Sequence, residues 1–151
     1  MNSFEKEHVL QPYNSISSHF KQTRVYLWPS AKTFLDTIKS YELVADIGCG
    51  NGRGIKEYPF ISIGCDICLP NLIEASSQLD GVLRANAINL PYKNNQFDKL
   101  ISIAGIHHLS SFERRRQAIV ELVRIVRPGG KLFIQVWALE QPPESRRKFT
   151  K

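Results

Sequence analysis

Long hydrophobic runs and cysteines are both scarce in this sequence of 151 residues. A membrane-spanning helix needs roughly 18 or more consecutive apolar residues, and no segment approaches that length, so we expect no membrane association. The N-terminus lacks the basic start and apolar run of a secretory signal peptide. The three cysteines are Cys49, Cys65 and Cys68. This odd, low number predicts reduced thiols and an intracellular protein rather than a disulfide framework.

Sequence signatures of metal binding and redox chemistry are also weak. Cys65 and Cys68 have the spacing of half a zinc site, but no second pair of ligands is evident. The four histidines include the neighbours His107 and His108, whose side chains should diverge from a loop. We therefore predict no metal site and interpret the thiols as incidental.

Composition and charge fit one basic domain. Hydrophobic residues make up 42% of the chain, and its length suits a single domain spanning 1–151. The net charge of +6 favours anionic partners, nucleic acid among them, although many basic proteins bind none. We divide the domain into an N-terminal cap segment (1–28), a cofactor-binding core (29–140) and a basic tail (141–151).

Hydrophobic patterns predict that helices and strands alternate along the core. Apolar runs predict strands at 43–47, 61–66, 82–85, 97–103 and 131–138, and other patterns predict helices that begin near Pro29, Pro70 and Ser110. Ser110 with Glu113 fits a capping box, and Pro128-Gly129-Gly130 should end the last helix. This order predicts an α/β fold, with a mainly parallel sheet, helices on both faces and a ligand site at the C-terminal strand ends.

A glycine-rich motif follows the first predicted strand. It spans Asp46 to Gly52, with glycine at positions 48, 50 and 52. Such glycines let the backbone turn sharply and approach a ligand closely. A dinucleotide fingerprint begun at Gly48 would need glycine where Arg53 stands, and the Gly-Lys-Ser/Thr of a phosphate loop is absent. The pattern is typical of S-adenosylmethionine-dependent methyltransferases, with an ordinary glycine-rich turn as the alternative.

Polar residues after the next two strands favour a nucleoside ligand. Asp66 ends the second strand, where a carboxylate can accept hydrogen bonds from both ribose hydroxyls of an adenosine. Dinucleotide enzymes use an acid at the same place, and a helix N-cap is the alternative role for Asp66. Asn86 follows the third strand, where methyltransferases of this class usually hold adenine with an acid. Asn86 would be a weaker, uncharged partner of the adenine amino group.

The loop after the fourth strand carries His107 and His108. It lacks the Asn/Asp-Pro-Pro-Tyr/Phe motif that methyltransferases of base amino nitrogens often have at this position. The two histidines could line a substrate pocket or be ordinary loop residues, and the sequence leaves both interpretations open.

Taken together, the segments resemble the methyltransferase family that esterifies 5-carboxymethyluridine at the wobble position of tRNA. The discriminating matches are His19-Phe20, Thr23-Arg24, Trp28-Pro29, Ile106-His107-His108 and Val136 to Gln141. The glycine loop and the Pro-Gly-Gly turn match many methyltransferases. The resemblance covers nearly the whole chain, but family members continue past Gln141 with two further strands that this sequence lacks.

The resemblance implies a Rossmann-like class I methyltransferase fold that binds S-adenosyl-L-methionine. It implies cofactor-binding roles for Asp46, Gly48, Gly50, Gly52, Asp66, Ile67, Asn86, Ala87 and Ile103. The methyl acceptor would be a carboxylate, which is anionic at neutral pH and needs no general base. Arg24 is the implied group that orients this carboxylate, with His107 and His108 in the same pocket. Substrate contacts are also implied for Trp28, Arg114 and Arg115, although Trp28 could instead pack against the helix start.

Partners follow from the same resemblance. The substrate would be tRNA, and related methyltransferases require a small zinc-binding activator subunit that holds the zinc itself. We expect the activator to form a heterodimer with this chain by pairing with the exposed edge of the strand at 82–85. The expected location is the cytoplasm, with the nucleus as a second location.

Two other functions remain open at this level. A small-molecule methyltransferase, as in quinone biosynthesis, would share the glycine loop, Leu90-Pro91 and Pro128-Gly129-Gly130, but would not predict Thr23-Arg24 or Trp137 to Gln141. A truncated domain that binds the cofactor or a partner without turnover would fit the absence of the last two strands.

Overall fold

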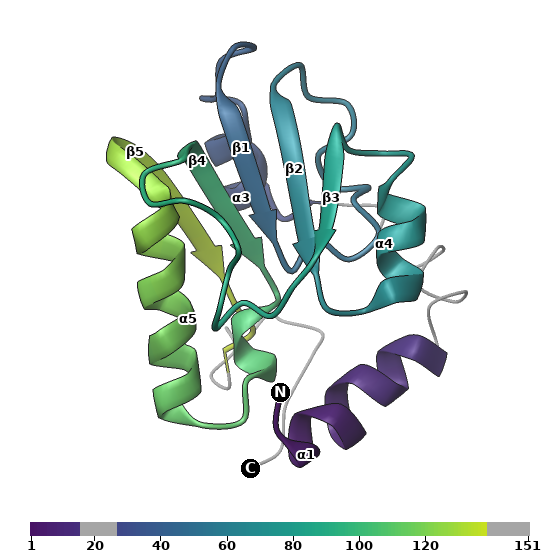
Figure 1. Ribbon diagram of the computed structural model, residues 1–151. Helices are drawn as coiled ribbons and strands as arrows, with labels where there is room; N and C mark the ends of the chain where they lie inside the picture. Colours follow the sequence, from purple (N-terminus) through teal and green to yellow (C-terminus); the bar gives the residue numbers. More distant parts are fainter. Residues whose placement is uncertain (16–26, 139–151) are drawn as a thin grey trace, which may run out of the picture.

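The computed structural model describes residues 1–15 and 27–138. These residues form a five-stranded parallel sheet in the order β3-β2-β1-β4-β5 (Figure 1). The strands are β1 (Leu43–Ile47), β2 (Ile61–Asp66), β3 (Gly81–Arg84), β4 (Phe97–Ile103) and β5 (Val126–Gln135). The predicted α/β fold with a parallel sheet is confirmed.

Helices connect the strands and precede the sheet. The connecting and preceding helices are α3 (Pro29–Leu35), α4 (Leu69–Ala75), the 3-10 turn η2 (Ile106–His108) and α5 (Phe112–Ile125). The chain begins with α1 (Ser3–Glu5), which runs directly into the π-helical turn η1 (Lys6–Leu10) and stays helical over 11–15. We call this continuous segment, residues 3–15, the N-terminal helix.

The sheet is covered on both faces, as its apolar strands require. Leu122 of α5 packs in one core cluster with Leu100 of β4. Leu35 of α3 packs in the other cluster with Val44 of β1 and Ile101 of β4. Because successive strand residues point to opposite faces, Leu100 and Ile101 serve different clusters. Because both faces are buried, apolar residues of one strand can serve either face, as Leu100 and Ile101 of β4 do.

The beginning of α5 differs from the predicted capping box. Ser111, not Ser110, is the N-cap residue, and its side chain accepts a hydrogen bond from the Arg114 backbone N–H. Ser110 is occupied elsewhere, because its backbone N–H and its hydroxyl both donate to the Glu5 carboxylate. The capping prediction was therefore wrong by one residue, since a distant partner competes for the Ser110 side chain.

The last strand begins earlier than its sequence indicated. Helix α5 ends at Ile125, and Val126 is already extended and pairs with Phe97 of β4. The register then shifts before Lys131 pairs with Lys99, so residues 127–130 bulge from the ladder. This bulge holds the Pro-Gly-Gly turn, which therefore lies within β5 and not at the end of the helix.

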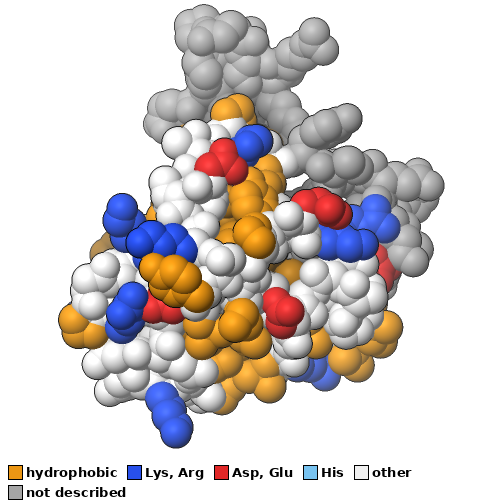
Figure 2. Space-filling model, turned by 90° about the horizontal axis from the view of Figure 1, so that it is seen from above, with side chains coloured by type: hydrophobic (Ala, Val, Ile, Leu, Met, Phe, Trp, Pro, Cys, Tyr) orange, Lys and Arg blue, Asp and Glu red, His pale blue; other side chains and the backbone are white. Residues whose placement is uncertain are grey.

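The C-terminal ends of all five strands lie along one edge of the sheet, and the N-terminal helix and η2 lie beyond that edge (Figure 1). The opposite edge faces the viewer in Figure 2, where basic side chains are spread among hydrophobic and neutral ones and do not form one continuous patch. In residues 1–15 and 27–138, no helix is long and apolar enough to cross a bilayer.

Candidate cofactor site

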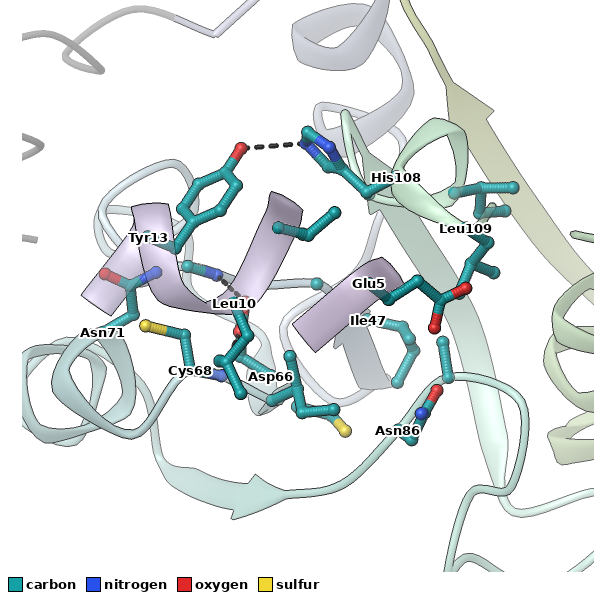
Figure 3. Close-up of a pocket in the computed structure, with 18 of the residues that line it drawn as sticks. Glu5, Leu10, Tyr13, Ile47, Asp66, Cys68, Asn71, Asn86, His108 and Leu109 are labelled. Carbon is teal, nitrogen blue, oxygen red and sulfur yellow. Dashed lines mark hydrogen bonds between the residues drawn. The ribbon is translucent and has the colours of Figure 1, made fainter. Parts of the chain in front are cut away.

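A pocket lies at the C-terminal ends of β1, β2 and β4, between these strands and the N-terminal helix (Figure 3). About 910 Å³ of space lies between its walls, and part of this space is open solvent. Of the predicted cofactor residues, those that line it are Gly48, Gly50, Asp66, Ile67, Asn86 and Ala87. The fold therefore brings together predicted residues that lie at the C-terminal ends of β1, β2 and β3.

The Asp66 carboxylate is fixed by the backbone around it. One oxygen accepts from the Gly50 N–H at 2.9 Å, and the other accepts from the Cys68 N–H at 2.8 Å. These bonds tie the end of β2 to the glycine loop after β1 and hold the carboxylate at the pocket wall. An ionised carboxylate has about four acceptor positions, so it can also accept from vicinal hydroxyls of a ligand.

The three glycines of the loop have different roles. Gly48, Gly50 and Gly52 all have positive φ, at 82°, 54° and 74°. Gly48 and Gly50 line the pocket, whereas a Cβ at Gly52 would lie 2.9 Å from the side chain of Leu79. Gly52 therefore allows close packing behind the loop and is not part of the pocket wall, contrary to the role expected from the motif.

The adenine position predicted at Asn86 and Ala87 lies in the pocket wall. The Asn86 side-chain oxygen accepts from the backbone N–H of Ile88 at 3.2 Å, and its backbone bridges to Asn89. Helix α5 holds the loop that follows, because the Arg124 guanidinium donates to the carbonyl of Leu90 and to that of Tyr92. The position of Asn86 thus depends on a distant helix.

Ile103 was predicted as a cofactor residue, but its neighbours Ser102 and Ala104 line the pocket instead. Ile103 packs against the cluster on the α3 and α4 face. The Ser102 hydroxyl donates to the Ile47 carbonyl at 2.8 Å and links β4 to β1 below the pocket. The prediction for Ile103 was wrong because alternation along β4 turns its side chain away from the ligand side.

The two histidines lie on the 3-10 turn η2 with their rings in contact, so the expected divergence of their side chains is wrong. His108 lines the pocket, and its Nε2 lies 2.8 Å from the Tyr13 hydroxyl of the N-terminal helix. Figure 3 shows the Tyr13 and His108 side chains meeting across the pocket from different elements. His107 stacks at an angle against His108, with ring centroids 4.3 Å apart, but is not part of the wall.

None of the predicted substrate residues Trp28, Arg114 and Arg115 lines the pocket. Arg114 binds Glu5 through two nitrogens, and Arg115 donates to the Leu109 carbonyl at 2.8 Å. Both guanidinium groups thus have partners within the protein, and their contact with tRNA stays a prediction. Trp28 precedes α3 and packs edge to face on Trp137, with ring centroids 4.7 Å apart, whereas the alternative prediction was packing against the helix start. Arg24 lies outside the described residues.

Sequence reasoning missed the contribution of the N-terminal helix. Five residues of the chain start line the pocket, namely Met1, Glu5, Val9, Leu10 and Tyr13. Glu5, Val9 and Tyr13 recur every four positions, which puts them on one face of the N-terminal helix. That spacing could have revealed the face, but the acidic Glu5 within it hides the apolar periodicity.

Burial controls the ionisation of the groups around the pocket. Burial, reinforced by the charge of Asp66, raises the pKa of Asp46 to about 7. Asp46 is buried in β1 and does not line the pocket, so it supports the loop from behind. Burial also raises the pKa of Cys65 to about 12, which keeps this thiol protonated at neutral pH. Within the described part of the chain, no three His, Cys, Asp or Glu side chains are grouped to hold a metal ion.

A family model described as a methyltransferase domain matches residues 45–134, which include every strand end at the pocket. The chain belongs to this methyltransferase domain family. Two curated relatives carry the name tRNA (carboxymethyluridine(34)-5-O)-methyltransferase. The one from Arabidopsis thaliana is 46% identical over 93% of this chain and 35% of its own length, and the one from Schizosaccharomyces pombe is 40% identical over 97% and 64%. The chain therefore spans about a third to two thirds of these relatives.

Solved structures confirm the methyltransferase fold. One match is a chain from the complex between the Haloferax volcanii Trm112 methyltransferase activator and a putative methyltransferase, with a TM-score of 0.71, 20% identity and coverage of 83% of this chain and 59% of that chain. Another is a possible histamine N-methyltransferase from Thermotoga maritima, with a TM-score of 0.69, 21% identity and coverage of 83% and 60%.

The methyltransferase domain assigns S-adenosylmethionine to this pocket, and the residues present fit it. The Asp66 carboxylate, held by two backbone N–H groups, suits the ribose hydroxyls. Gly48 lines the pocket with φ at 82°, a backbone conformation that residues with a side chain rarely adopt. Ile67 and Ala87 supply apolar surface for a purine. This cofactor provides an electrophilic methyl group, and the protein's task is to orient it.

Proposed function

We propose that this chain catalyses transfer of a methyl group from S-adenosylmethionine to the carboxylate of 5-carboxymethyluridine at the tRNA wobble position, giving the methyl ester. The observation that carries the proposal is the similarity to two relatives named for this activity, which extends over 93% and 97% of the chain. At this coverage the similarity extends beyond residues 45–134, which the family model matches.

The pocket chemistry suits this acceptor. A carboxylate is already ionised at neutral pH, so its methylation requires alignment with the methyl donor and no proton removal. Alignment to roughly 3–3.5 Å between the reacting atoms supplies most of the available acceleration. The Tyr13 and His108 pair crosses the pocket next to the glycine loop and offers polar groups for a substrate oxygen. We propose that the Arg24 guanidinium binds the substrate carboxylate through two N–H groups.

The three consecutive arginines of α5 differ in their exposure to solvent. Arg116 is an exposed arginine on α5, next to Arg114 and Arg115, which bind within the protein. Phosphate contacts through such exposed residues would make tRNA binding weaken steeply as salt rises. We therefore propose that tRNA is held by separate exposed cations and not by the Arg114–Arg115 pair.

We also propose that a Trm112-like activator subunit pairs with β3. This strand is at the edge of the sheet, so one side of its backbone has no neighbouring strand among the described residues. Exposed apolar side chains surround it, with Leu83 on β3 and Leu69 and Ile73 on α4. A partner that adds a strand here would satisfy the backbone and cover these side chains. Replacing Leu83 with Lys should then prevent co-purification of the two proteins.

The deciding experiment uses the full-length protein co-expressed with its activator. Labelled S-adenosylmethionine is supplied with tRNA that carries 5-carboxymethyluridine, and ester formation is measured. We expect incorporation in the parent protein and a loss of about tenfold or more on Arg24→Ala, because a charged hydrogen-bond partner of the substrate is removed.

Lys131→Ala is the matched control. It removes one positive charge from an exposed residue of β5 that pairs with Lys99 of β4 and does not line the pocket. This variant should keep its activity. Absence of methyl transfer to the modified tRNA, despite cofactor binding, would overturn the proposed function, and methyl transfer to a small carboxylic acid alone would favour a small-molecule enzyme.

A further inference from the structure

The Glu5 carboxylate accepts four hydrogen bonds from the chain segment that follows the two histidines. One oxygen accepts from the Ser110 N–H at 3.0 Å and from the Ser110 hydroxyl at 3.1 Å. Two nitrogens of Arg114 donate to the two oxygens, each at 2.6 Å. A two-pronged arginine–carboxylate pair fixes orientation as well as distance.

Because the Glu5 carboxylate is buried, separating it from Arg114 would be energetically costly. Glu5 is 3% exposed, although it is an acidic residue near the start of the chain. Burial by itself raises the pKa of Glu5, but hydrogen bonds from Arg114 and Ser110 outweigh it and the pKa is lowered overall. The carboxylate is therefore ionised at neutral pH, and separating it from Arg114 would leave a charge without its partner.

The contact joins two walls of the cofactor pocket. On one side, Val9, Leu10 and Tyr13 of the N-terminal helix line the pocket. On the other side, Ser110 is two residues after His108, whose ring contacts Tyr13. Figure 3 shows Glu5 and Tyr13 at the two ends of the helix, both turned toward the loop that carries His108. The helix is thus attached to this loop at two points.

The helix has a local irregularity between these two points. The segment Lys6–Leu10 is π-helical, and Glu5 and Tyr13 lie on either side of it. A π-helical turn inserts an extra residue, and such turns often occur at functional sites. Here it changes the register along the helix, so that both Glu5 and Tyr13 face the same loop.

We propose that Glu5 is a positioning residue that couples closure of the N-terminal helix over the cofactor to placement of His108. The helix cannot leave the pocket without breaking the Glu5–Arg114 pair, and breaking this pair also frees the loop that carries the histidine. Cofactor release and movement of His108 are then one event. The role in catalysis rests on the proposed function, whereas the coupling itself concerns only the cofactor and this chain.

The test measures the release rate of S-adenosylhomocysteine from the full-length protein in complex with its activator, without tRNA. Glu5→Gln keeps the shape of the side chain but removes its charge, and release should become roughly tenfold faster or more. Arg114→Met should have a similar effect. The double variant should release no faster than either single variant, because both substitutions break the same pair.

Glu7→Gln is the matched control, since Glu7 is an exposed acid on the same helix. Its release rate should stay within about twofold of the parent, well below the tenfold change that loss of a charged hydrogen bond produces. A second readout is the NMR signal of the His108 ring. In the parent it should shift when S-adenosylhomocysteine binds, and in Glu5→Gln at saturating ligand it should stay near its ligand-free position.

Additive effects of the two substitutions, or a normal His108 shift in Glu5→Gln, would show that Glu5 only stabilises the fold. If Glu5→Gln does not fold, Arg114→Lys tests the same point, because it keeps the charge and loses the fork. A protein with the expected release pattern but no methyl transfer to modified tRNA would refute the proposed function and leave the coupling intact.

Discussion

The Lys99 ammonium lies 2.5 Å from a carboxylate oxygen of Glu42, and both residues are buried at the N-terminal edge of the sheet. The second Glu42 oxygen accepts from the Lys39 N–H at 2.9 Å. This contact joins β4 to the turn before β1 at the edge of the sheet opposite the cofactor pocket. It therefore offers a test of stability that is separate from ligand binding.

Replacing Lys99 with Met should lower the free energy of unfolding by about 2–4 kcal/mol, because the Glu42 carboxylate is left buried without its charged partner. Adding Glu42→Leu to this variant should restore part of the loss, since no charge is then buried. Chemical denaturation at neutral pH measures both effects. If the double variant loses as much free energy of unfolding as the two single variants together, the two side chains are not coupled.

The different surroundings of Gly52 and Gly129 predict different losses of stability on substitution with alanine. Gly52 and Gly129 both have positive φ, at 74° and 77°, but a Cβ at Gly52 would lie 2.9 Å from Leu79, whereas a Cβ at Gly129 meets open space. Gly129→Ala should cost about 1–2 kcal/mol of stability from its backbone conformation. Gly52→Ala should cost about 1–3 kcal/mol more because of overpacking. Thermal or chemical denaturation compares the two, and equal losses would contradict the packing role of Gly52.

The raised pKa of Asp46 predicts that the stability of the protein depends on pH. Its pKa is raised from 3.8 to about 7 by burial and by the charge of Asp66, so the folded state binds a proton that the unfolded state has lost. Stability should therefore fall as pH rises from about 4 to 7 and then level off. The group opposes folding by up to about 4 kcal/mol above pH 7.

Asp46→Asn should remove this dependence and unfold less readily than the parent at pH 8, with little difference at pH 4. Denaturation curves at pH 4, 6 and 8 measure the change. If the stability of the parent protein does not decline relative to that of Asp46→Asn between pH 4 and 7, the Asp46 carboxyl ionises normally.

Asp66 predicts an effect on cofactor binding. Asp66→Asn keeps an oxygen acceptor but presents an N–H₂ group on its other side, so it cannot accept from Gly50, Cys68 and a ribose together. Affinity for S-adenosylhomocysteine should fall about tenfold or more, as expected for loss of charged hydrogen bonds. Isothermal titration calorimetry gives the dissociation constant. The exposed Glu57 offers a control as Glu57→Gln, and equal affinities of the two variants would rule out the proposed role.

The sequence by itself determined the order of strands and helices and the place of the glycine loop. The strands at 61–66 and 97–103 were predicted with the bounds that the structure has, because runs of apolar residues between turn signals are a local property. Asp66 was found for the same reason, since the end of a strand fixes where its last side chain lies.

Only the tertiary structure decided which side chains form the pocket. Ile103 packs in the cluster on the α3 face while Ser102 and Ala104 line the pocket, and this difference depends on how β4 is oriented in the sheet. Arg114 pairs with Glu5, which is 109 positions earlier in the sequence. Local periodicity carries no information about such a partner. From sequence alone, an acid on a helical face is expected to face solvent, and only the folded structure brings the partly buried Arg114 to Glu5.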